Sequence, residues 1–107
     1  MGLDLASTQD LAAMKLSAIV QRGSKKDFID IFALAKSGMA LSEMLDAYQY
    51  KFKTREIGHV LYALTYFDDS DRELSPIMLW KVDWQTIKTS IRGWVNGWVQ
   101  SSKADRR

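Results

Sequence analysis

A chain of 107 residues with 47% hydrophobic residues is the size of one folded domain and is too apolar to be a disordered one. Its formal net charge of +2 gives no strong signal for nucleic-acid binding, and no apolar run is long enough to cross a membrane. The absence of cysteine excludes disulfides and thiolate zinc sites, and we expect a reducing, cytoplasmic location.

Two helices are predicted in the first third of the chain. Ser7 followed by Asp10 resembles a capping box, and Gly23 ends the helix that follows. Ser24 and Asp27 repeat this start signal for a second helix, which Gly38 ends. Apolar residues recur at helical spacing in both segments: Leu11, Ala12, Leu16, Ile19, Val20, Phe28, Ile31, Phe32, Leu34 and Ala35.

The rest of the chain also shows helical periodicity. We expect a third helix that starts at Ser42 and a fourth that starts at Thr54. The apolar residues of the third are Met44, Leu45, Tyr48 and Phe52, and those of the fourth are Ile57, Val60, Leu61, Leu64 and either Tyr66 or Phe67. Residues 68–76 are polar and indicate a loop, and residues 77–80 are expected to form a short helical turn. Asp83 is expected to be the N-cap of a last helix. Residues 101–107 predict a frayed tail. The sequence therefore predicts a single all-α domain over residues 1–107, with about five helices and short turns.

The turn between the first two helices concentrates charge. Lys15 and Arg22 lie seven residues apart on one side of the first helix, and Asp27 and Asp30 lie three apart on one side of the second. The connection between them is very short, so we expect the cationic side to face the acidic side. A structural ion pair between packed helices explains this pattern as well as an active site does.

Two stretches, DLAAMKL at 10–16 and RGSKKDFID at 22–30, resemble a known pattern. They are similar to the C-terminal half of the AbiEii-type nucleotidyltransferases, the toxin family of type IV abortive-infection systems. That family tends to show A-x-K-x-x-A and then R-x-x-x-K/R-D-x-x-D. The resemblance covers about residues 5–90 and is met by Ala13, Lys15, Ala18, Arg22, Lys26, Asp27 and Asp30.

The resemblance implies roles for the charged residues. Lys15 and Asp30 would be catalytic, with Lys15 contacting a nucleoside triphosphate and Asp30 supporting the site. Arg22, Lys26 and Asp27 would contribute to nucleotide binding. An antitoxin is the partner that the family implies.

The family's metal site is not matched by this sequence. Enzymes of this superfamily carry an upstream Gly-Gly/Ser motif and a pair of strand-borne acids, and it is these acids that bind magnesium. We expect no metal site in this chain. Magnesium and a nucleoside triphosphate are expected only if a missing N-terminal half completes the site. We therefore expect a chain that is inactive alone, either a truncated remnant or one piece of a split toxin enzyme.

Two other patterns invite a metal-site interpretation. Glu56 and His59 form E-x-x-H, half of a di-iron pattern, but the chain has no second histidine. We expect His59 to be a packed or surface histidine. Asp69 and Asp71 form D-x-D without a preceding strand, and we expect no catalytic metal there either.

Four tryptophans pair at helical spacing, Trp80 with Trp84 and Trp94 with Trp98. Such pairs are typical of helix packing in a core. The alternative function is a small helical protein-interaction module that uses its tryptophan-rich C-terminal helix. In that case the face of Trp94 and Trp98 binds a second copy or a partner polypeptide.

Overall fold

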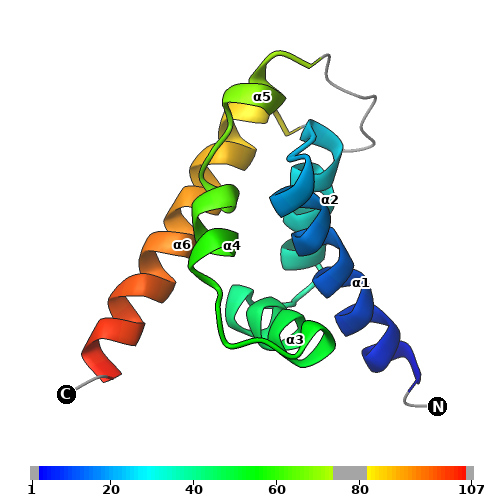
Figure 1. Ribbon diagram of the computed structural model, residues 1–107. Coiled ribbons are helices and arrows are strands. Elements are labelled where there is room, and N and C mark those ends of the chain that lie inside the picture. Colours follow the sequence, from blue (N-terminus) through cyan, green and yellow to red (C-terminus); the bar gives the residue numbers. More distant parts are fainter. Residues whose placement is uncertain (1–2, 74–81, 106–107) are drawn as a thin grey trace.

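The computed structural model describes residues 3–73 and 82–105, and within these ranges the regular structure is entirely helical (Figure 1). The helices are α1 (Leu3–Gln21), α2 (Lys25–Lys36), α3 (Leu41–Phe52), α4 (Gly58–Leu64), the four-residue α5 (Asp68–Asp71) and α6 (Trp84–Asp105). The predicted all-α fold is confirmed. Among the described helices, none combines the length and the apolar character that a membrane span requires.

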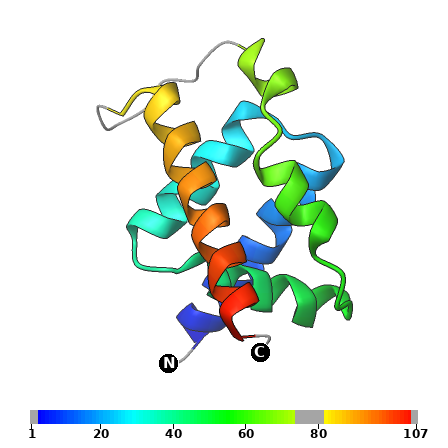
Figure 2. The same ribbon diagram turned by 90° about the vertical axis from the view of Figure 1, so that its left-hand side faces the viewer.

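The two longest helices lie on opposite sides of the molecule. α1 packs against α2, α3 and α4, and α6 packs against the same three helices from the other side (Figures 1 and 2). The core between them is filled by apolar side chains from all five longer helices. Its largest fully buried members are Phe28, Leu16, Ile31, Met44, Leu45, Leu64, Ile87, Ile91 and Val60.

The turn between α1 and α2 has the predicted chemistry. Gly23 adopts φ 58°, and its amide donates to the carbonyl of Ala18 at 3.2 Å, which ends α1. Ser24 is the N-cap of α2, and its hydroxyl oxygen accepts from the amide of Asp27 at 3.4 Å. Because only three residues separate the two helices, the last turn of α1 lies next to the first turn of α2.

Three predicted helix starts are wrong by one to four residues. α1 begins at Leu3 instead of Ser7, because the residues before Ser7 are compatible with a helix and the capping signal is only local. α3 begins at Leu41, where the carboxylate of Glu43 accepts from the amide of Ala40 at 2.9 Å. α4 begins at Gly58 instead of Thr54, because residues 54–57 have no regular secondary structure.

The last third of the chain agrees with the prediction in part. Asp83 caps α6 as predicted, and its Oδ1 accepts from the amide of Thr86 at 2.8 Å. The predicted loop contains α5, and the predicted turn at residues 77–80 lies outside the described residues. α6 continues to Asp105, so most of the predicted frayed tail is helical. No proline or glycine occurs after Gly97 to end the helix.

Candidate functional site

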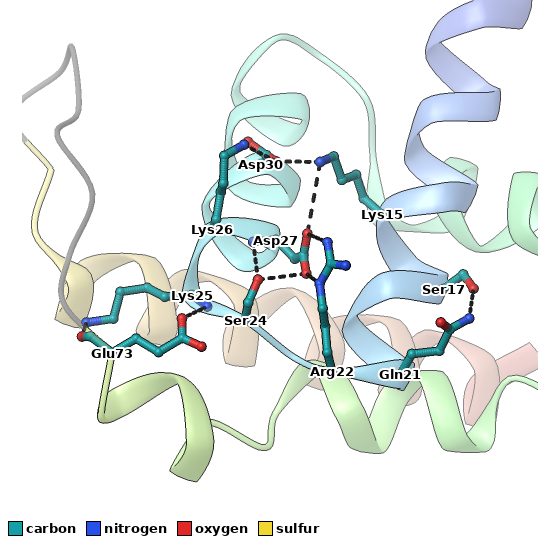
Figure 3. Close-up of polar contacts among 10 residues, drawn as sticks. All are labelled: Lys15, Ser17, Gln21, Arg22, Ser24, Lys25, Lys26, Asp27, Asp30 and Glu73. Carbon is teal, nitrogen blue, oxygen red and sulfur yellow. Dashed lines mark hydrogen bonds and ion pairs between the residues drawn. The ribbon is translucent and has the colours of Figure 1, made fainter.

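Lys15 of α1 and Asp30 of α2 meet at the surface between their helices (Figure 3). The Lys15 Nζ lies 2.7 Å from Asp30 Oδ2 and 4.0 Å from Asp27 Oδ1. The predicted convergence of an ammonium and two carboxylates across the turn is therefore confirmed. The side chain of Lys15 remains 24% exposed, so its ammonium is held in place and is still within reach of a ligand.

Asp27 is the buried part of the same site, and the exposed Arg22 binds it. Arg22 Nε and Nη2 donate to the two carboxylate oxygens of Asp27 at 2.9 and 3.2 Å, and the Ser24 hydroxyl donates to Asp27 Oδ2 at 2.8 Å. Only 1% of the Asp27 side chain is exposed. Burial alone would raise the pKa of Asp27, but hydrogen bonds from Arg22 and Ser24 and the charges of Arg22 and Lys15 outweigh it and lower that pKa. Asp27 is therefore an anion at neutral pH.

Lys26 completes the group, with its Nζ 3.6 Å from Asp30 Oδ2 and its side chain exposed. The structure thus brings together all five predicted site residues, which we call the charged cluster: Lys15, Arg22, Lys26, Asp27 and Asp30. Three cations and two carboxylates leave one excess positive charge. A surface with this balance favours an anionic ligand.

The charged cluster does not suit a magnesium ion. Magnesium takes carboxylates that are free to coordinate it, whereas Asp27 and Asp30 are each paired with cations. Within residues 3–73 and 82–105, no three His, Cys, Asp or Glu side chains gather as a metal site would require. Magnesium ligands for this site would have to come from elsewhere.

The two weaker metal patterns do not form metal sites in the described part of the chain. Glu56 precedes α4, so it does not share a helical face with His59. His59 is an exposed residue of α4 whose Nε2 lies 3.1 Å from the hydroxyl of Tyr48. Asp71 Oδ1 accepts from Trp84 Nε1 at 2.7 Å and from Lys88 Nζ at 2.8 Å.

A second polar network was not predicted from the sequence. The Glu73 carboxylate accepts from the backbone amide of Lys25 at 2.7 Å, and Lys25 Nζ donates to the carbonyl of Glu73 at 2.8 Å (Figure 3). Lys25 and Lys88 are both buried, with their ammonium groups 5.0 and 5.8 Å from the ring centre of Trp84. The two hydrogen bonds between Glu73 and Lys25 connect the segment after α5 to the first turn of α2. Its partners are 48 residues apart in the sequence, so no local pattern pointed to it.

Trp94 and Trp98 both pack partly against the core, as their spacing predicted. The ring of Trp94 stacks on Phe32, with ring centres 5.8 Å apart. The same two tryptophans line a groove of about 740 Å³ with the turn between α2 and α3. We call this the tryptophan groove, and its other lining residues are Ala35, Gly38, Met39, Ala40, Leu41, Ser42, Gly97, Ser101 and Ser102. None of the described residues that line it carries a charged side chain.

The described residues thus form an all-helical domain with three cations and two carboxylates gathered between its first two helices. The chain is a member of the family described as nucleotidyl transferase AbiEii toxin, type IV TA system, whose model matches residues 2–95. It is similar to the uncharacterized protein aq_aa25 of Aquifex aeolicus (strain VF5), with 37% identity over 75 residues. These residues are 69% of this chain and 36% of that protein, so the match spans about a third of the relative. No solved structure matches the chain.

Proposed function

We propose that this domain is the C-terminal helical half of an AbiEii-type nucleotidyltransferase and that it contributes the triphosphate-binding side of the active site. The observation that carries the proposal is the position of the Lys15 ammonium. It lies 2.7 Å from Asp30 and stays partly exposed within a cluster that has more cations than anions. The family match supports the same assignment.

Each member of the charged cluster has a role in this proposal. The Lys15 ammonium contacts phosphate oxygens and stabilises the negative charge that develops on them during nucleotidyl transfer. Asp30 holds that ammonium in position, and it is also a proton acceptor within reach of the site. The exposed cations of Arg22 and Lys26 bind the remaining phosphate oxygens. Asp27 fixes the guanidinium of Arg22 with two hydrogen bonds.

In this proposal the metal-binding half lies outside the residues described here. The described residues offer no magnesium site, and the relative is about three times as long as the region that matches it. We therefore expect this chain to be inactive on its own and to work with a catalytic half supplied from elsewhere, as in a split enzyme. The family's description also makes an antitoxin the expected partner.

Lys15→Met tests the proposal because it removes the charge and keeps most of the apolar stem. Binding of a nucleoside triphosphate, followed by isothermal titration with and without magnesium, should weaken at least about tenfold, as is typical for the loss of a hydrogen bond between charged groups. Lys51→Met is the matched control, because Lys51 also forms an ion pair between two helices, with Asp10 at 2.6 Å. Equal binding by the two variants would contradict the proposal.

The tryptophan groove favours a second candidate function, self-association. The described residues that line the groove carry no charge, so two such faces can pack against each other without like-charge repulsion between these residues. This suits a symmetric contact between two identical copies. In this candidate function the chain is an interaction module whose partner is a second copy of itself.

A further inference from the structure

A pocket of about 290 Å³ shares Arg22 with the charged cluster. It lies between the last turn of α1 and the α4–α5 segment, and we call it the tyrosine pocket. The lining residues that matter here are Arg22, Gly23, His59, Tyr62, Tyr66 and Asp69. Ligand pockets typically measure about 300–1,000 Å³, so this one has room for a single flat ring system and not for a whole nucleotide.

Two tyrosines line this pocket without belonging to the core: Tyr62 in α4 and Tyr66, two residues after its last residue. Tyr62 and Tyr66 stack with ring centres 5.7 Å apart, and their residues are 67% and 41% exposed. The core instead takes Phe67, the next residue, which is buried. Exposed aromatic rings at a pocket are a platform on which nucleobases stack.

Side chains of both charges line the pocket. Arg22 belongs both to the pocket and to the charged cluster. Asp69 also lines the pocket, and its carboxylate and that of Asp68 raise the pKa of Tyr66. Carboxylates next to Tyr66 repel phosphates, whereas they favour the N–H groups of a base, since carboxylates accept hydrogen bonds from them.

We propose that the tyrosine pocket binds the nucleobase of the nucleoside triphosphate whose phosphates contact the charged cluster. This inference rests on the proposed function and adds the site for the other end of the same substrate. The base stacks on Tyr62 and Tyr66, its N–H groups face Asp69, and Arg22 separates it from the phosphates. A terminal base of an acceptor RNA has the same chemistry, and the test distinguishes the two sources.

The experiment titrates the ¹⁵N-labelled chain with separate parts of the substrate and follows its amide signals. Inorganic triphosphate should shift the amides around Lys15 and Lys26, nucleosides should shift those around Tyr62 and Tyr66, and a nucleoside triphosphate should shift both groups. Tyr62→Ala should weaken the nucleoside response at least about fivefold, since stacking on one aromatic ring contributes about 1–3 kcal/mol per base. The triphosphate response should not change.

Tyr50→Ala is the matched control, because Tyr50 is 87% exposed on α3 and does not line the pocket. Absence of nucleoside shifts at the pocket, or an equal loss in both variants, would overturn the inference and leave the triphosphate result standing. Absence of triphosphate shifts alone would overturn the proposed function instead. A short single-stranded RNA that shifts the pocket when nucleoside triphosphates do not would overturn the assignment to the triphosphate substrate.

Discussion

Asp27 takes part both in the N-terminal cap of α2 and in the candidate site. Its backbone amide is bound by the N-cap Ser24, and its carboxylate is bound by both Ser24 and Arg22. The sequence predicted the capping role because the spacing of Ser24 and Asp27 is a local signal. The two-pronged contact with Arg22 was not predicted, because it depends on the side-chain conformation of an arginine in the turn after α1.

Asp27→Asn should make the protein less stable at neutral pH by about 1–3 kcal/mol, the range for hydrogen bonds between charged groups. Because the pKa of Asp27 is lowered in the folded protein, its contribution is complete above the unfolded value of about 4. The contribution is lost as the pH falls through the folded pKa. Urea unfolding of both proteins at pH 7 and pH 3 should therefore show a difference that shrinks in acid.

A control variant is needed because protonation of other carboxylates also lowers the free energy of unfolding in acid. The pKa of Asp71 is lowered by hydrogen bonds from Lys88 and Trp84, and that of Asp83 by hydrogen bonds from Thr86. Asp46→Asn, at an exposed position of α3, serves as the control. A difference between wild type and Asp27→Asn that stays constant from pH 7 to pH 3 would rule out this electrostatic role.

At the scale of helices, the glycines Gly23 and Gly38 correctly predicted where α1 and α2 end. Gly23 and Gly38 adopt φ 58° and φ 116° just after α1 and α2, as predicted for residues that end helices. The starts of α1, α3 and α4 were less accurate because polar residues such as Ser7, Ser42 and Thr54 occur inside helices and in irregular segments as well as at caps. Tyr66 and Phe67 were alternatives for the apolar face of the fourth helix, but α4 ends at Leu64, before both of them, and packing buries Phe67.

Gly23→Ala should destabilise the fold by about 1–2 kcal/mol, because a side chain at φ 58° is strained. The added Cβ would also lie 3.3 Å from the carbonyl oxygen of Ile19. Gly93→Ala, within α6 and with open space around its Cβ, should instead stabilise the protein by about 0.5–1 kcal/mol. Thermal unfolding of the two variants measures both effects, and effects of the same sign would refute the strain assigned to Gly23.

At the scale of the whole molecule, the packing of α6 across α2 and α3 creates the tryptophan groove. Gly97→Lys places a charged side chain in this groove without an internal clash, since nothing lies within 4 Å of the added Cβ. If the groove binds a second copy, sedimentation velocity should show a dimer for the wild type and a monomer for Gly97→Lys. Gly93→Lys adds the same charge to α6 outside the groove and should leave the dimer intact. A wild type that is monomeric at high concentration would exclude this function.

The sequence by itself determined that the protein is helical, where α1 and α2 meet, and that Lys15 and Asp30 converge. These features depend on helical periodicity, capping and a short connection, which are local interactions. Only the tertiary structure decided that Tyr62 and Tyr66 lie beside Arg22, that Glu73 binds the first turn of α2, and that Trp98 lines a groove with the α2–α3 turn. These contacts join residues far apart in the chain, so they follow from the way the helices pack and not from the spacing of residues within any one helix.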